Sequence, residues 1–95
     1  MTSTPLTLLV QGYLNLDWPD DYPSMWAAVD DFIESEPRAA GVLDEIDDVL
    51  KRMPSENDRR RYVLDDLDSG YLPDADGYTM TSWLEALKDH VRDRL

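Results

Sequence analysis

Prolines divide this sequence into short segments, and the segments between them carry apolar residues at helical spacing. Pro19 and Pro23 disfavour a helix at the residue before each of them, and Pro54 ends a long amphipathic run. Each run has a single apolar stripe, so the helices become stable by packing their stripes together. A chain of 95 residues has room for one such core. The sequence therefore predicts an all-α fold, a compact bundle of about five short helices forming a single domain over residues 1–95.

The boundaries of these helices follow from the apolar spacing and the prolines. We expect helices over residues 5–14, from Pro23 or Ser24 to a stop at Ser35, over 36–53, over 56–68, and from Ser82 to the C-terminus. The alternation in Leu6-Thr7-Leu8 would also suit a strand, but the five apolar positions of the first segment favour a helix. Residues 15–22 should be extended or turning, and residues 70–80 form the longest expected loop.

Capping residues support three of these boundaries. Ser35 and Ser55 are N-cap candidates for the third and fourth helices, and Ser82 with Glu85 has the spacing of a capping box for the last. Gly70 suits the left-handed position that follows a helix. The buried stripes are expected to consist of Tyr22, Trp26, Val29 and Ile33; of Ala39, Leu43, Ile46, Leu50 and Met53; of Tyr62, Val63 and Leu67; and of Trp83, Leu84, Leu87, Val91 and Leu95.

The charge balance restricts the classes of partner. Twenty-one acidic residues against nine basic ones give a net charge of −12, and residues 1–50 hold eleven acids and only one base, Arg38. Such a field repels nucleic acids and anionic membranes and attracts basic protein surfaces. The sequence has no basic leader before its first apolar residues and no run near the ~20 apolar residues of a membrane span. We expect a cytoplasmic protein that binds neither membrane nor nucleic acid directly.

Catalytic and metal sites have little support in the sequence. His90, the one histidine, lies among charged neighbours, so a solvated surface position is expected. Asp74, Asp76 and Glu85 match the first, third and twelfth positions of a calcium loop, but Tyr78 and Thr79 occupy positions that require a ligand and a glycine. The cluster Arg59-Arg60-Arg61 is expected to pair with the neighbouring acids Asp58, Asp65 and Asp66. We predict no enzyme activity, no cofactor and no metal.

Acidic residues beside the apolar stripes form the candidate binding surface. Those at the joint before the second helix and along the second and third helices would merge into one negative face if these two helices were antiparallel neighbours. The predicted contact residues are Asp20, Asp21, Asp30, Glu34, Asp44, Asp47 and Asp48.

Several parts of the sequence carry a family likeness. The most specific is Tyr13-Leu14-Asn15-Leu16-Asp17-Trp18-Pro19 with Tyr22. The others are the helix end Asp31-Phe32-Ile33, the helix that contains Leu43, Ile46 and Asp47, the helix that begins at Ser55, and the closing Trp83-Leu84-x-x-Leu87. Together they resemble the immunity proteins of contact-dependent growth inhibition systems. The resemblance implies a small cytosolic antidote that binds the C-terminal toxin domain of a large secreted effector, often a nuclease, and covers its active site. An acidic face would suit a basic toxin domain. The alternative is an acidic helical adaptor, or a DNA-mimic regulator of a basic host protein.

The likeness also marks a set of motif residues, and two roles are open for them. Large aromatics beside carboxylates either anchor a small core or contact the partner directly. The structural role is favoured here, with Asp17 capping or bonding the turn and with Trp18 and Tyr22 fixing the first helix against the second. The motif residues are Tyr13, Asp17, Trp18, Tyr22 and Trp83.

Overall fold

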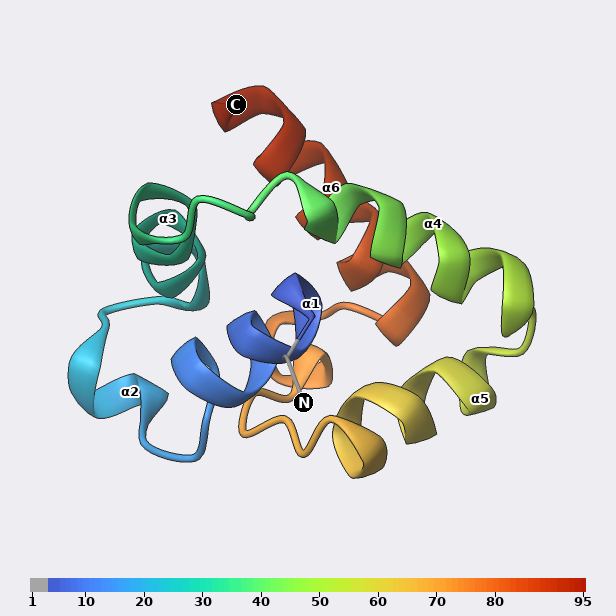
Figure 1. The fold of residues 1–95 in the computed structure, drawn as a ribbon. Helices are drawn as coiled ribbons and strands as arrows, with labels where there is room; N and C mark the ends of the chain where they lie inside the picture. Colours follow the sequence, from blue (N-terminus) through green and yellow to red (C-terminus); the bar gives the residue numbers. More distant parts are fainter. Residues whose placement is uncertain (1–3) are drawn as a thin grey trace.

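The computed structural model of the protein describes residues 4–95, and every regular element in that range is a helix (Figure 1). In chain order the elements are α1 (Pro5–Leu8), η1 (Leu9–Tyr13), α2 (Trp18–Asp21), α3 (Met25–Ser35), α4 (Gly41–Arg52), α5 (Glu56–Arg61), η2 (Tyr62–Asp66), η3 (Pro73–Asp76) and α6 (Met80–Arg94). Elements η1 and η2 are π-helical continuations of α1 and α5, and η3 is a 3-10 turn. The predicted all-α fold is confirmed, with five helical segments of seven or more residues and one shorter segment.

The first helix lies at the centre of the molecule, as Figure 1 shows for α1. Pro5 is in its first turn, and the Thr4 hydroxyl accepts a hydrogen bond from the Thr7 backbone N–H at 3.3 Å. Leu6, Leu9 and Val10 are essentially inaccessible to solvent. The helix packs on α4, where a Glu45 carboxylate oxygen accepts from the Leu6 N–H at 2.9 Å. This helix is therefore a core element.

Two predicted boundaries in the N-terminal half are wrong. Residues 18–21 form the helical turn α2, because a proline fits the first turn of a helix and Asp20 and Asp21 favour its N-terminal end. The next long helix, α4, begins at Gly41 and not at residue 36. Ser35 is the last residue of α3 and not an N-cap, since the Glu36 N–H still bonds to the Phe32 carbonyl at 2.9 Å.

In the C-terminal half, Ser55 caps α5 as predicted, but the other predicted caps are wrong. The left-handed residue after η2 is Asp68, with φ 56°, and not Gly70. Helix α6 begins before Ser82, with Thr79 as its N-cap. Ser82 is the third-position partner of Thr79 in the capping box, so Glu85 has no part in it.

The core is organised around α6, against which both α3 and α4 pack. Trp83, Leu84, Leu87 and Val91 are fully buried as predicted, whereas Leu95 is 62% exposed. The buried faces of α3 and α4 are rotated from the predicted stripes, so that Trp26, Ile33, Leu43, Leu50 and Met53 are only partly buried. Their places in the core are taken by Met25, Ala28, Phe32, Val42 and Val49. Adjacent apolar residues on one helix allow either face to be buried, and the neighbouring helices decide which.

Candidate functional site

The candidate site is the turn that joins η1 to α2, and the side chain of Asn15 fixes its shape. The Asn15 Oδ1 accepts a hydrogen bond from the Asp17 N–H at 3.0 Å, and its carbonyl accepts from the Trp18 N–H at 3.0 Å. Asparagine is suited to such turns because its side chain can bond to the backbone two residues on. The sequence predicted that the Asp17 side chain would cap or bond this turn. Asp17 is the N-cap residue of α2, but its carboxylate accepts no capping hydrogen bond from the helix.

A second segment clamps this turn from the side. The Gly70 N–H donates to the Leu14 carbonyl at 2.8 Å. A Cβ at Gly70 would lie 2.2 Å from the Asn15 carbonyl carbon and 2.3 Å from the Leu16 nitrogen. Only glycine permits this approach. The close approach of the two backbones, and not a left-handed conformation, is what requires glycine here.

Aromatic rings connect the turn to the core. The Tyr71 ring lies between two indoles, with ring centroids 5.7 Å from Trp18 and 5.5 Å from Trp83. The Tyr71 hydroxyl donates to Asp76 Oδ2 at 2.7 Å. Burial, followed by this hydrogen bond, raises the pKa of Tyr71. Trp18 and Trp83 therefore both make the contacts of core anchors.

The two motif tyrosines link the same region to α3. The Tyr13 ring meets Phe32 edge-on at 5.5 Å. The Tyr22 hydroxyl donates to Asp31 Oδ2 at 2.5 Å, and this bond, with desolvation, raises the pKa of Tyr22 to about 12. The turn is thus held on one side by α3 and on the other by residues 70–71.

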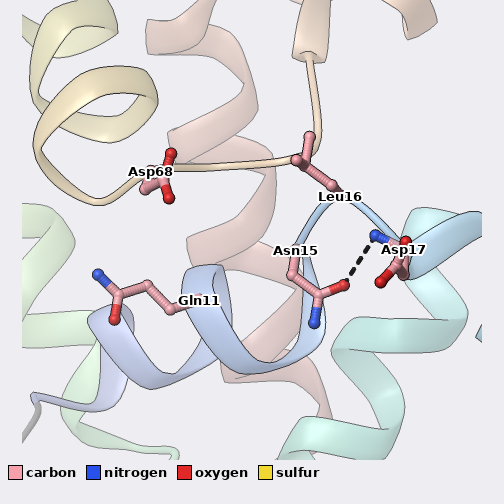
Figure 2. Close-up of a pocket in the computed structure, with 5 residues that line it drawn as sticks. All are labelled: Gln11, Asn15, Leu16, Asp17 and Asp68. Atoms are coloured by element: carbon pink, nitrogen blue, oxygen red, sulfur yellow. Dashed lines mark hydrogen bonds between the residues drawn. The ribbon is translucent and has the colours of Figure 1, made fainter.

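An open pocket of about 470 Å³ lies over this turn (Figure 2). It is lined by Gln11, Asn15, Leu16, Asp17 and Asp68. The Leu16 side chain is 85% exposed, although Leu14 two residues earlier is fully buried. In Figure 2, Asp68 and Asp17 lie on opposite sides of Leu16.

The predicted site residues include only Asp17 of this pocket and miss Gln11, Asn15, Leu16 and Asp68. Leu16 falls outside the helical stripe of residues 6–14, and that break in spacing was the available signal that its side chain faces away from the core. Gln11 and Asp68 carried no comparable signal. Asp68 reaches the pocket only because the chain after η2 returns to the turn at Gly70.

The seven predicted contact acids fall into two groups. Three of them are in ion pairs with basic side chains: Asp30 with His90 at 2.7 Å and Arg94 at 2.9 Å, Asp48 with Arg52 at 2.6 Å, and Asp47 with Lys88. The other four are exposed and make no ion pair within residues 4–95, namely Asp20, Asp21, Glu34 and Asp44. Helices α3 and α4 pack on α6 and not on each other as an antiparallel pair, so the single face expected from that pairing does not form.

Two predictions about basic groups are also wrong. His90 is not a solvated surface residue: its side chain is 20% exposed, stacks on Trp26 with centroids 4.4 Å apart, and bonds to Asp30. Trp26 and Asp30 lie one turn apart on α3, and this contact between helices cannot be read from α6 alone.

The arginine cluster does not pair with the neighbouring acids as predicted. Arg59 donates to the Met53 and Leu50 carbonyls, and Arg60 pairs with Asp74 at 2.5 Å.

The acids around the turn are free of such pairing. No lysine or arginine occurs in residues 1–37 or in residues 62–87, the two segments that build this surface. Six acids of the turn, of α2 and of the end of η2 are exposed, and none of them forms an ion pair within the described chain. They are Asp17, Asp20, Asp21, Asp65, Asp66 and Asp68. The acids of the turn and the end of η2, which we call the corner surface, therefore carry negative charge that no ion pair within residues 4–95 neutralises.

Metal and membrane features are not found in residues 4–95. No group of three or more potential ligand side chains is arranged to hold a metal ion. None of the helices combines the length and the apolar character that a membrane span requires.

The structure defines the class first: the described residues form a small all-helical domain with exposed carboxylates around one turn. A comparison with protein families assigns it more closely: the model of the CdiI immunity protein family matches residues 4–91. The chain belongs to the CdiI immunity protein family, and is a toxin-neutralising immunity protein of a contact-dependent growth inhibition system. This result favours the immunity interpretation over a host adaptor. No curated protein and no solved structure matches the chain.

Proposed function

We propose that the protein neutralises a basic nuclease toxin domain by covering its active site with the corner surface. Nucleases bind the phosphate backbone through lysine and arginine, so their active sites are positively charged. A surface of closely spaced carboxylates is attracted to the same groups. The complex would form in the cytoplasm, where an imported nuclease meets its substrate.

The observation that carries this proposal is the unpaired acidity of the corner surface. Elsewhere, basic side chains neutralise acids on α3, α4 and α6, as the pairs of Asp30, Asp47 and Asp48 illustrate. At the corner no base is available in either contributing segment. Exposed charges that are left unpaired raise the rate of association with an oppositely charged partner.

The corner surface also has the rigidity that inhibition requires. Its turn is fixed by the Asn15 hydrogen bonds and by the close contact with Gly70. A surface that is already ordered loses little conformational entropy when it binds. Of the predicted contact acids, Asp20 and Asp21 belong to this surface, whereas Glu34 and Asp44 lie on α3 and α4.

The test is inhibition of the toxin domain encoded immediately upstream of this gene. The purified toxin domain should degrade nucleic acid alone and lose that activity with one equivalent of this protein. Asp20→Asn/Asp21→Asn should lower the association rate constant at least about 3-fold at low salt, and the difference should shrink at high salt.

Two matched double variants give the comparison. Glu85→Gln/Asp93→Asn neutralises two exposed acids of α6 and should change the rate less than about 2-fold. Glu34→Gln/Asp44→Asn tests the acids of α3 and α4 in the same way. A wild-type protein that does not inhibit the toxin overturns the proposed function. Equal rates for the corner variant and the α6 variant overturn the corner surface as the contact site.

A further inference from the structure

Leu16 is the most exposed large apolar side chain of the described chain, and it lies between two carboxylates. We propose that the pocket around Leu16 receives an arginine side chain of the toxin domain. Its methylene stem would lie on Leu16, its guanidinium group would pair with the adjacent Asp17, and Asp68 would add to the negative potential of the pocket. This inference rests on the proposed function and identifies the group that the corner surface recognises.

The apolar part of the pocket is a fixed feature. Leu6, Leu9 and Leu14 of the same segment are at most 1% exposed and fill the core positions next to the turn. The Leu16 backbone nitrogen lies against Gly70, and the turn around it is closed by Asn15. Leu16 therefore cannot turn into the core without breaking that contact. It is presented to solvent in one position.

The charged part of the pocket comes from two distant segments. Asp17 follows directly in the turn, while Asp68 is placed by its left-handed backbone at the end of η2. Neither carboxylate accepts a hydrogen bond within residues 4–95, and Gln11 adds a further exposed polar side chain at the rim. The pocket thus offers free acceptors on two sides of an apolar centre.

Arginine fits this combination better than other groups do. Its guanidinium has five donors in a planar fork that matches a carboxylate bidentately, whereas lysine is a compact point charge with a stronger hydration shell. Its three methylene groups can cover an apolar side chain while the charged end reaches the carboxylates. A purely apolar side chain would leave Asp17 and Asp68 desolvated without partners, which is costly.

The experiment measures binding of the upstream-encoded toxin domain to variants of the intact protein. Asp17→Asn/Asp68→Asn removes both charges, and asparagine tolerates the left-handed conformation of residue 68. We expect its Kd to rise at least about 10-fold, and Leu16→Ser to raise the Kd by a similar factor. The controls are Leu72→Ser, another exposed leucine, and Glu85→Gln/Asp93→Asn. Both controls should change the Kd less than about 2-fold, and circular dichroism should show the same thermal midpoint for variants and wild type.

A chemical readout identifies the arginine. Phenylglyoxal modifies accessible arginines, so the toxin arginine in the pocket should be protected in the wild-type complex. The same arginine should react in the complex with Asp17→Asn/Asp68→Asn at saturating concentration. A wild-type protein that does not bind the toxin overturns both the proposed function and this inference. Tight wild-type binding overturns this inference alone if the pocket variants bind within about 2-fold of it, or if they protect the same arginines.

Discussion

The indole of Trp18 meets the ring of Tyr71 edge-on, with ring centroids 5.7 Å apart and an angle of 77° between the planes. Tyr71 in turn packs on Trp83 of α6. The turn that carries the candidate site is therefore attached to the C-terminal helix. A second ring contact, between Tyr13 and Phe32, joins η1 to α3.

Replacing Trp18 by alanine should separate stability from binding. Trp18 is only partly buried, so Trp18→Ala is expected to lower the free energy of unfolding by about 2 kcal/mol, less than the roughly 3–5 kcal/mol of a fully buried large aromatic. Because the turn loses its contact with Tyr71, toxin affinity should fall as well. Trp26→Ala is the matched control: it loses the stack on His90 and a similar stability but leaves the turn intact. Urea unfolding and toxin titration measure the two effects. Equal affinities for both variants would contradict this role of Trp18.

Gly70 should be among the least replaceable residues of the protein. Gly70→Ala forces the backbones of residues 70 and 15 apart, because the new Cβ would lie 2.2 Å from the Asn15 carbonyl carbon. We expect a loss of at least about 2 kcal/mol in the free energy of unfolding. At Gly12 the nearest atom to a Cβ is a Leu8 methyl carbon at 3.7 Å, so Gly12→Ala should be neutral or stabilise the helix by up to about 1 kcal/mol. Chemical denaturation compares them, and a stable Gly70→Ala protein would show that the turn can move.

The three consecutive arginines should differ sharply in their effect on stability. Arg59 donates to the Met53 carbonyl at 2.6 Å, the Leu50 carbonyl at 2.9 Å and the Thr81 hydroxyl at 2.7 Å, and so caps α4 and joins it to α6. Arg59→Ala should cost about 2 kcal/mol of unfolding free energy. Arg59→Lys should recover only part of that, because an ammonium cannot reach three acceptors in a planar fork.

Arg61 provides the control for Arg59. It is exposed and makes no ion pair within residues 4–95, so Arg61→Ala should change stability by less than about 0.5 kcal/mol. Thermal melts of the three variants distinguish these cases. Similar losses for Arg59→Ala and Arg61→Ala would mean that the arginines act through net charge and not through the cap.

The Tyr22–Asp31 hydrogen bond should make stability fall at alkaline pH. The pKa of Tyr22 is about 12 in the folded protein and 10.0 as the ordinary value, so the folded state holds this proton more tightly than the unfolded state. Its contribution is fully present below pH 10 and is lost as the pH rises towards 12. Tyr22→Phe should flatten this decline, leaving the part due to Tyr62 and Tyr71, whose pKa values burial also raises. Urea midpoints measured across this pH range test it, and identical slopes for wild type and Tyr22→Phe would refute it.

The sequence by itself determined the helical composition of this protein and most of its core. The spacing of apolar residues gave the five main helices, and Ser55 marked the start of α5 correctly. These features are local, because a helix is set by residues three and four positions apart and its caps by the nearest side chains. Local ambiguity accounts for the error at Ser82, because Thr79 three residues earlier is an equally good cap. Ser35 instead ends α3, and α4 begins at Gly41 without a side-chain cap.

The tertiary structure alone decided where the candidate site lies. The motif around Asp17 and Trp18 could be recognised in the sequence, but the pocket needs Asp68, which reaches it only through the Gly70–Leu14 contact. Likewise, the pairing of Asp30 with His90, and of Asp47 with Lys88, depends on how α6 packs against α3 and α4. Charge in the sequence gives the sign of the surface. Which acids stay unpaired depends on contacts between residues far apart in the chain, and helical spacing carries no information about those.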